Sequence, residues 1–333
     1  MKTFAFEHAD TVVGAVRSAT AGARYYAGGT NLLDLMKLGV ETPAALVDIG
    51  RLDLRAITAT DSGGVLVGAG ATNSAVANHP VIRRDYPMLS QAILSGATTQ
   101  IRNMATAGGN LMQRTRCPYF MDPSFAHCNK RDPGSGCAAR DGFNREHALF
   151  GASAACVAVH PSDMAVALAA LDARVHVRGP AGSRTVGLDE FFVLPGESPE
   201  RDNTLRPAEL ITGIELPPSR LARHSWYLKV RDRHSYAFAL VSVAAGVELL
   251  DGEIVAAALA LGGVAATPWR VAAAEAILIG ARATDTAFRA AAELITADAV
   301  PLAQNGFKVD LARNSVVRAL RRASAGHATA PTR

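Results

Sequence analysis

The segment Ala27-Gly28-Gly29-Thr30-Asn31-Leu32 constrains the fold more than any other short stretch of this sequence. It follows Arg24-Tyr25-Tyr26-Ala27, a short predicted strand, and precedes Leu32 to Leu38, whose apolar pattern predicts a helix. Glycines in such a strand-to-helix turn expose backbone N–H groups, and the start of the following helix favours an anion such as a pyrophosphate. The segment therefore predicts a turn suited to a phosphate-containing ligand.

A second stretch, Ala105-Thr106-Ala107-Gly108-Gly109-Asn110-Leu111, again places two glycines beside a hydroxyl and an amide. Neither stretch is the dinucleotide fingerprint GxGxxG or the phosphate loop GxxxxGK[ST]. Each one taken alone is typical of an ordinary tight turn. As a pair beside a cluster of cysteines, the two stretches indicate a cofactor site.

All four cysteines of the chain fall within one window of 40 residues, at Cys117, Cys128, Cys137 and Cys156. The spacings are too wide for a zinc finger or ribbon, which pairs its ligands two to four residues apart. Four thiolates in Gly- and Pro-rich loops favour an iron–sulfur cluster, whose irons each take one soft ligand. Disulfides, zinc-binding thiols and incidental thiols remain open as alternatives.

The order of apolar patterns predicts a mixed α/β chain with a small βαβ-like unit at residues 1–55. The cysteine window, residues 112–156, is rich in Gly, Pro and Asn and has the composition of an insertion. Between residues 64 and 216 we expect a strand at 64–70, helices starting near 75 and spanning 87–99 and 163–171, and strands at 174–178 and 210–216.

The pattern of apolar residues changes after Pro217-Pro218. Strands at 226–230, 237–250 and 254–262 are expected to form a meander, followed by Ala-rich helices at 271–280, 284–296 and 309–324. A domain boundary is expected near 218–223, and residues 326–333 form part of a small, polar and Pro-containing tail that we expect to be flexible.

Composition excludes several classes of protein. The chain has 333 residues, 49% of them hydrophobic and 19% charged, with a formal net charge of +4 that is too small and dispersed to indicate nucleic-acid binding. No apolar run of 18 residues predicts a membrane span, and the N-terminal residues have no signal-peptide pattern. The nine histidines show no HxH or HExxH spacing, so His127 beside Cys128 is expected to be a loop residue and not a ligand.

Several segments, in this order, resemble those of one enzyme family. The segments AGGTNLLDLM, IRNMATAGGNL, HPSDMAVALAAL, ITGIELP and YLKVRDRHSYAFALVSVAA are similar to those of FAD-binding subunits of the xanthine dehydrogenase, or molybdenum hydroxylase, family. The resemblance spans residues 3 to 325. RTRCPYF, HCNKRDPGSGC and the later Cys156 resemble the flavoprotein subunits of bacterial periplasmic aldehyde oxidoreductases, whose equivalent cysteines hold a [4Fe–4S] cluster absent from most of the family.

The resemblance implies an α+β fold: a bi-lobed FAD-binding domain of the vanillyl-alcohol-oxidase (PCMH) type and a C-terminal α/β domain with a three-stranded sheet and helices. It implies a FAD-binding domain at 1–220, with lobes at about 1–55 and 56–220, and a C-terminal domain at 221–325. The residues that it implies around FAD are Ala27, Gly28, Gly29, Thr30, Asn31 and Leu32 at the pyrophosphate, Thr106, Gly108, Gly109 and Asn110 from the second lobe, Asp163 with Ser162 at polar groups of the flavin, and Ile214 and Lys229 near its ring.

The function that the resemblance implies is electron transfer within a heterotrimer. A molybdopterin-binding large subunit would oxidise an aldehyde, and a small subunit with two [2Fe–2S] clusters would pass electrons to FAD on this chain and on to an external acceptor. The alternatives are the flavin subunit of an aromatic acyl-CoA reductase, a self-contained FAD oxidase, and a disulfide-stapled binding module. The expected compartment is the periplasm, reached on a partner's twin-arginine signal, with the cytoplasm as the alternative.

Overall fold

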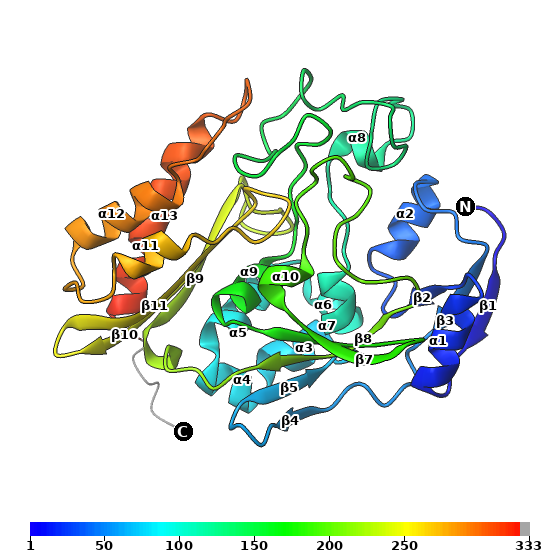
Figure 1. Ribbon diagram of the computed structural model, residues 1–333, viewed down its shortest axis with the longest axis horizontal. Coiled ribbons are helices and arrows are strands. Elements are labelled where there is room, and N and C mark those ends of the chain that lie inside the picture. The colour runs from blue at the N-terminus through cyan, green and yellow to red at the C-terminus, as the bar shows by residue number, and fades with distance from the viewer. Residues whose placement is uncertain (327–333) are drawn as a thin grey trace.

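The computed structural model describes residues 1–326, whose β-strands form three sheets (Figure 1). The first sheet is parallel, with strand order β1-β3-β2, and α1 packs on it. A parallel pair needs a crossover connection, which α1 and α2 provide. The elements of this first lobe are β1 (Ala5–His8), α1 (Val12–Thr20), β2 (Arg24–Tyr26), α2 (Leu32–Leu38) and β3 (Ala45–Asp48).

The second sheet has five strands in the order β4-β5-β8-β6-β7, and its neighbouring strands are antiparallel. The central strand β8 comes late in the sequence and inserts between β5 and β6, so the cysteine window and α9 are both built between strands of one sheet. The strands are β4 (Ile57–Ala59), β5 (Val65–Gly68), β6 (Arg174–Gly179), β7 (Gly182–Gly187) and β8 (Leu210–Leu216).

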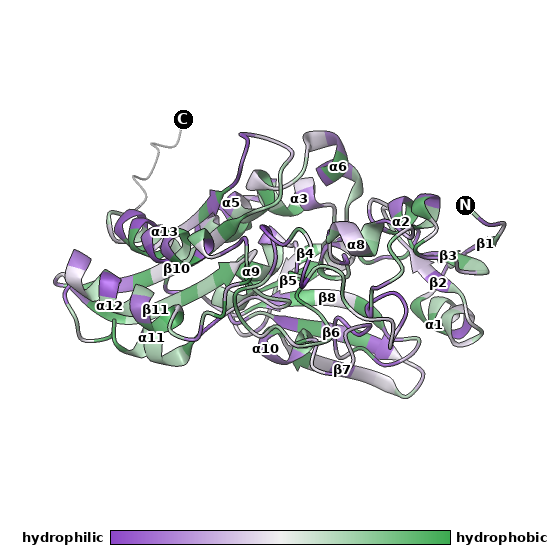
Figure 2. Ribbon diagram, turned by 90° about the horizontal axis from the view of Figure 1, so that it is seen from above, coloured by the Kyte–Doolittle hydropathy of each residue, from purple (hydrophilic) through white to green (hydrophobic). Residues whose placement is uncertain are grey.

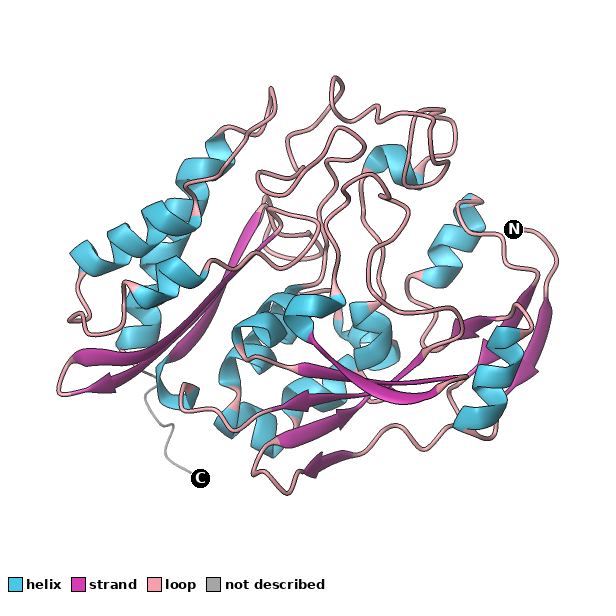
Figure 3. Ribbon diagram, in the orientation of Figure 1, coloured by secondary structure: helices cyan, strands magenta, loops and turns pink. Residues whose placement is uncertain are grey.

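Short helices connect β5 to the cysteine window, and the window itself is nearly all loop (Figure 3). In Figure 1 these loops and α8 lie at the top, between the first lobe and the C-terminal elements. The helices of this part are α3 (Asn73–Asn78), α4 (Pro80–Asp85), α5 (Pro87–Ser95), α6 (Thr99–Met104), α7 (Ala107–Leu111), α8 (Pro118–Met121), α9 (Asp163–Ala170) and α10 (Leu188–Phe191).

The third sheet is an antiparallel meander with strand order β11-β10-β9. Its hydrophobic strands, mostly green in Figure 2, lie between α13 on one side and α5 and α9 on the other. The elements are the 3₁₀ helix η1 (Ala222–His224), β9 (Ser225–Val230), β10 (Val241–Leu250), β11 (Glu253–Gly262), α11 (Ala272–Ala276), α12 (Asp285–Ile295) and α13 (Phe307–Ser324).

Most of the expected elements are confirmed, including the C-terminal three-stranded meander. The expected helix at 87–99 was wrong in its extent, because Ala97 has a left-handed φ of 50° and separates α5 from α6. No apolar pattern predicted β7, whose exposed residues Ser183 and Thr185 are polar. The predicted tail lies almost wholly at residues 327–333, outside the described residues.

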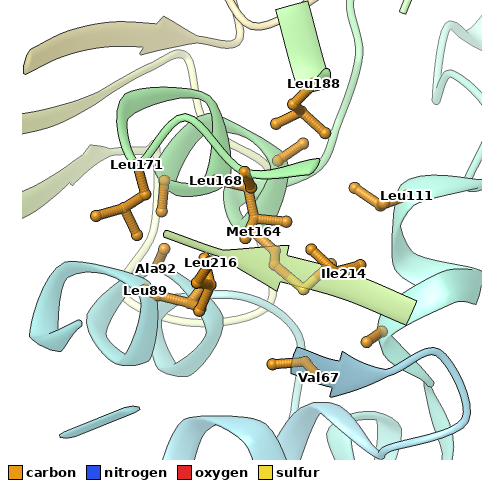
Figure 4. Packing of buried hydrophobic residues seen from close by; sticks show 14 of the residues in the cluster. Val67, Leu89, Ala92, Leu111, Met164, Leu168, Leu171, Leu188, Ile214 and Leu216 are labelled. Atoms are coloured by element: carbon orange, nitrogen blue, oxygen red, sulfur yellow. The ribbon is translucent and has the colours of Figure 1, made fainter. Parts of the chain in front are cut away.

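One hydrophobic core joins the second sheet to α5 and α9, and a second core lies between the third sheet and α11 to α13. Figure 4 shows the first core, where Met164 and Leu168 of α9 pack toward Ile214 and Leu216 of β8. Because α9 contributes both to this core and to the face of the third sheet, its N-terminal residues are held in a fixed position relative to both.

Candidate functional site

Two cavities run between the first lobe, the second sheet and the C-terminal sheet. The larger, which we call the loop cavity, has a volume of about 860 Å³ and is lined by both glycine-containing turns and by residues 201–211. The second, the lysine cavity, has a volume of about 460 Å³ and is lined by Asp163 and Lys229 among others. Thr30, Asn31 and Gly109 line both cavities, so the two meet at the glycine turns.

The first glycine turn presents free backbone donors at this junction. Within residues 1–326, none of the N–H groups of residues 28–31 donates a hydrogen bond. The side-chain Nδ2 of Asn31 is buried without a partner, while its Oδ1 accepts from the Arg114 N–H at 2.9 Å. Several unpaired donors at one place fit a ligand that supplies anionic oxygens, such as a pyrophosphate.

Close packing of backbone against backbone fixes that turn. A Cβ on Gly28 would lie 1.9 Å from the carbonyl oxygen of Met104, so only glycine fits there. Gly29 has a φ of +70°, which a side chain would strain. The contact with Met104 brings the first turn of one lobe against the start of the second turn of the other.

The second turn is the N-terminus of α7. Thr106 caps that helix, with its Oγ1 accepting from the Gly109 N–H at 3.2 Å. Gly108 lies against Ala69, and its N–H donates to the Ala69 carbonyl at 2.8 Å. The backbone N–H groups of this turn are therefore already paired. Its glycines allow the backbone to lie close to the cavity and do not supply donors for an anion.

Asn110 and Ser162 are brought together as a pair. The Ser162 hydroxyl donates to Asn110 Oδ1 at 2.5 Å and accepts from the Ala165 N–H, so it caps α9. Asn110 lines the lysine cavity, while Ser162 lines a smaller neighbouring cavity with Asp163. The pair fixes the edge of the second turn to the start of α9.

Asp163 and Lys229 form a buried ion pair in the wall of the lysine cavity. Lys229 Nζ lies 2.7 Å from Asp163 Oδ2, and their side chains are 4% and 9% exposed. The hydroxyl of Tyr227 donates to Asp163 Oδ1 at 2.7 Å. Burial, followed by the Asp163 charge, raises the pKa of Tyr227 well above 10, so its hydroxyl keeps its proton.

Arg116 differs from the other cations around the lysine cavity. Arg102 donates to three backbone carbonyls and the Thr99 hydroxyl. Arg116 makes no hydrogen bond within residues 1–326; its Nε is buried without a partner, and its nearest carboxylate oxygen, on Asp34, is 3.9 Å away. Burial lowers the pKa of Arg116, and Asp34 offsets that effect only in part.

Ile214 is a predicted cofactor residue that lines none of these cavities. It is 1% exposed and lies in the core of the second sheet, paired with Val67 and Val175 (Figure 4). The same strand reaches the loop cavity through Leu210 and Ile211. The residues of β8 that line a cavity are therefore different from the one that was predicted.

The four cysteines, at most 39 residues apart in sequence, line one small cavity, which we call the thiol cavity. Cys117 caps the short helix α8, and Cys128 and Cys137 face each other in an isolated antiparallel bridge. The turn between these two is folded by Asn129, whose Oδ1 accepts from the N–H groups of Gly134 and Gly136. Local hydrogen bonds thus bring together thiols that are far apart in sequence.

All four thiols are free, so the disulfide interpretation is not supported. Across residues 1–326, no three His, Cys, Asp or Glu side chains are placed to share one metal ion. In a four-iron cluster each thiolate binds its own iron, so its ligands need not converge on one point. The donor set fits such a cluster, although the free space of about 10 Å³ means that the thiols would have to move apart to admit it.

Burial governs the chemistry of these thiols. It raises the pKa of Cys117 to about 12 and also raises the pKa of Cys156, with neighbouring thiols adding to both effects. A buried cation, Lys130, lines the same cavity and opposes the increase at Cys156. Thiols of this kind are protonated until a metal displaces the protons.

A linking cavity of about 50 Å³ lies between the thiol cavity and the lysine cavity. It is lined by Cys117, by Arg116 and Asp163, which also line the lysine cavity, and by two buried histidines. His147 Nε2 lies 3.1 Å from Cys117 Sγ, and burial lowers the pKa values of His147 and His160 to about 4, so both rings are neutral. Sequence reasoning named neither histidine, while His127 proved to be a loop residue bonded to the Ser135 carbonyl.

Comparisons with known proteins agree with this geometry. The family model described as "FAD binding domain in molybdopterin dehydrogenase" matches residues 2–219, and "CO dehydrogenase flavoprotein C-terminal domain" matches residues 226–323. The aldehyde oxidoreductase FAD-binding subunit PaoB of Escherichia coli is 50% identical over 98% of this chain and 99% of its own length. The glyceraldehyde dehydrogenase medium chain of Sulfolobus acidocaldarius is 28% identical over 79% of this chain and 75% of its own.

Solved structures of two enzymes contain chains with the same fold as this protein. A chain of the CO dehydrogenase from Oligotropha carboxidovorans superposes with a TM-score of 0.77 at 23% identity, covering 98% of this chain and 99% of that one. A chain of quinoline 2-oxidoreductase from Pseudomonas putida 86 gives a TM-score of 0.75 at 24% identity, with the same coverage. With nearly the whole chain matched by sequence and by fold, this protein belongs to the FAD-binding subunits of the molybdenum hydroxylase family and is an oxidoreductase subunit.

Proposed function

We propose that one FAD lies across the loop and lysine cavities, with its pyrophosphate at residues 28–31. The observation that carries this proposal is the junction of the two cavities at Thr30, Asn31 and Gly109, beside a row of unpaired N–H groups. The adenosine would occupy the loop cavity, and the isoalloxazine the lysine cavity. Cavities of several hundred Å³ with few polar groups are typical of cofactor sites.

The residues around the proposed FAD have separable tasks. The N–H groups of residues 28–31 and Asn31 Nδ2 would bind phosphate oxygens. The Asp163–Lys229 pair and Tyr227 form a rigid, hydrogen-bonded wall that would orient the ring and exclude water. FAD itself supplies the ability to take up electrons singly and release them in pairs.

We also propose that Cys117, Cys128, Cys137 and Cys156 bind a [4Fe–4S] cluster. Four free thiols around one cavity, without disulfides or carboxylates among them, support this assignment. Most subunits of this type have no such cluster, so it would be a feature of one branch of the family. The cluster could serve as a relay, as a charge that sets the flavin potential, or as a structural staple.

The complete activity that we propose is electron transfer in a heterotrimeric molybdenum aldehyde oxidoreductase. A molybdopterin-binding large subunit would oxidise the aldehyde, and a [2Fe–2S] small subunit would pass electrons to this chain, which would deliver them to an external acceptor. The support is the identity of 50% over nearly the full length with a subunit named for aldehyde oxidation. The substrate would be selected by the large subunit and not by this chain.

Domain limits and compartment belong to the same proposal. We assign residues 1–220 to the FAD-binding domain and 221–325 to the C-terminal domain, with the iron–sulfur insertion at 112–156. We propose export of the assembled complex to the periplasm on a partner's signal, with the cytoplasm as the alternative. No helix within residues 1–326 is long and apolar enough to cross a membrane.

Anaerobic purification of the complex, with quantification of FAD, iron and sulfide and with EPR after reduction, tests this function. One FAD and a four-iron signal that is lost in Cys137→Ser would support both assignments. FAD without iron would remove the cluster and keep the flavin assignment. Bleaching of the isolated chain's flavin by an alcohol or aldehyde would instead favour a self-contained oxidase, and absence of FAD would overturn the proposal.

A further inference from the structure

Lys229, the cation expected near the flavin ring, is neutralised by a carboxylate in the structure. Lys229 Nζ lies 2.7 Å from the Asp163 carboxylate, and both groups are more than nine-tenths buried. The pair presents almost no net charge to the lysine cavity, because the two opposite charges are in direct contact. A positive charge that acts on a ligand in this cavity must therefore come from another residue.

Arg116 is the arginine at the lysine cavity whose side-chain donors are unpaired, because Arg102 and Arg233, which also line it, donate to backbone carbonyls. Its guanidinium makes no hydrogen bond within residues 1–326, its Nε is buried, and three quarters of the side chain is covered. The nearest carboxylate belongs to Asp34, which is 55% exposed and 3.9 Å away, so water screens it. By contrast, Arg114 in the loop cavity has carboxylate partners at 2.7 and 2.9 Å, on Glu41 and Asp202.

The position of Arg116 places that charge toward the ring and not toward the phosphates. Arg116 lines the lysine cavity and the linking cavity, but not the loop cavity. Its guanidinium carbon lies 5.4 Å from the ring centroid of Phe238, which lines the same two cavities. This cation–π contact holds the guanidinium at the wall of the lysine cavity, on the proposed isoalloxazine side of the junction formed by Thr30, Asn31 and Gly109.

We propose that Arg116 is a positioning and charge-compensating residue for the bound flavin, which stabilises the negative charge of the reduced ring and so raises its potential. This inference rests on the proposed binding of FAD. When the flavin is reduced, its ring would accept two electrons from the partner clusters and one proton, so that it gains one negative charge. A fixed cation near the ring favours the reduced form over the oxidised one.

The sequence alone does not distinguish Arg116 from Arg102 and Arg114, since all three lie close to the second glycine turn. The distinction depends on where the carboxylates and carbonyls lie after folding. Arg102 is bonded to the turn at 94–99 and Arg114 to two carboxylates, whereas the Arg116 side chain makes no hydrogen bond within residues 1–326.

The test is the flavin midpoint potential of the FAD-loaded chain or complex, measured by spectroelectrochemical titration in Arg116→Gln, Arg116→Lys and Asp34→Asn. Arg116→Gln should weaken binding of reduced relative to oxidised FAD about tenfold, which for a two-electron couple lowers the potential by about 30 mV. Arg116→Lys should restore most of the loss. Asp34→Asn should shift the potential in the opposite direction, since it removes the one carboxylate near the cation.

Opposite shifts in the two variants would support the inference, because a purely structural role of either residue would not reverse sign. An unchanged potential in Arg116→Gln, or equal loss of affinity for oxidised and reduced FAD, would overturn it; the second result would mean that Arg116 binds phosphate. If Arg116→Gln loses FAD altogether, Asp34→Asn decides, and an unshifted potential there overturns the inference. A wild-type chain that binds no FAD would contradict the proposed function instead.

Discussion

The glycine turns and the thiol cavity are two sites built by opposite means. The glycine turns are fixed by backbone, through a contact so close that Gly28 has no room for a methyl group. The thiol cavity is formed by side chains on loops, and burial raises the pKa values of its Cys117 and Cys156 thiols. We infer that the flavin site is formed before its cofactor arrives, while the thiol site is completed by iron.

The two sites are nevertheless connected by a line of buried charges. Lys130, in the wall of the thiol cavity, donates to Asp202 at 2.6 Å, and Asp202 also accepts from Arg114 at 2.9 Å. The backbone N–H of Arg114 donates to Asn31 in the first glycine turn. The difference between the sites can therefore be tested by perturbing one and measuring both.

The largest effect is expected from Lys229→Met, within the flavin site. The change leaves the Asp163 carboxylate buried with only Tyr227 as partner, which costs about 3 to 5 kcal/mol of unfolding free energy. Chemical denaturation measures this loss. The double variant Lys229→Met, Asp163→Asn should recover a large part of it, and no recovery would show that the lysine acts through packing and not through the ion pair.

A pH effect of about 3 kcal/mol is expected from His160, in the linking cavity between the two sites. Burial lowers its pKa from 6.5 to about 4, so the unfolded chain binds more protons between these values. The stability that depends on a neutral His160 is fully present above pH 6.5 and is lost as the pH falls towards 4. Denaturation at several pH values should show a shallower acid loss in His160→Gln than in wild type, and equal slopes would contradict this account.

Gly28→Ala should cost about 2 kcal/mol and abolish FAD retention, because its Cβ would meet the Met104 carbonyl. The iron content should stay near that of wild type, since the thiol cavity is built separately. Gly306→Ala, in open space at the start of α13, is the matched control and should keep both cofactors. Loss of iron together with FAD in Gly28→Ala would mean that the two sites do not form independently.

The smallest effect on the flavin site is expected from Cys137→Ser or Cys128→Ser. Either variant should lose iron, and its free energy of unfolding should fall by about 1 to 2 kcal/mol. FAD should stay bound, and the main effect should be on stability and not on turnover. Iron-depleted wild type should unfold at the same denaturant concentration as the variant. Variants that fold normally but no longer reduce the acceptor would contradict the role of the cluster as a staple and indicate a relay.

Sequence carried different amounts of information on the two sites. The paired glycines and the clustered cysteines predicted a position for each site, because close backbone approach and soft ligands each need particular residue types. Their surroundings could not be predicted in the same way. Pairing of Lys229 with Asp163, isolation of Arg116, and the contact of His147 with Cys117 all depend on residues that only the folded chain brings together.

Errors in the predicted elements have similar causes. The helix expected to continue to residue 99 ends at Ser95 because Ala97 adopts a left-handed conformation that composition does not signal. Ile214 was expected near the flavin from its segment, but it lies in the core of the second sheet, and it is Leu210 and Ile211 at the start of β8 that line the loop cavity. Which residue of a strand reaches the cavity depends on how the strand is placed in the folded chain and not on the segment alone.

Amide hydrogen exchange at residues 27–32, compared between the FAD-free and FAD-loaded chain, tests the central claim most directly. The N–H groups of residues 28–31 have no partner in the described chain, so they should exchange rapidly without FAD and become protected when the pyrophosphate binds. Protection at these residues with one FAD bound is the result that this account predicts. Stoichiometric FAD without protection there would contradict the placement of the pyrophosphate at the first glycine turn.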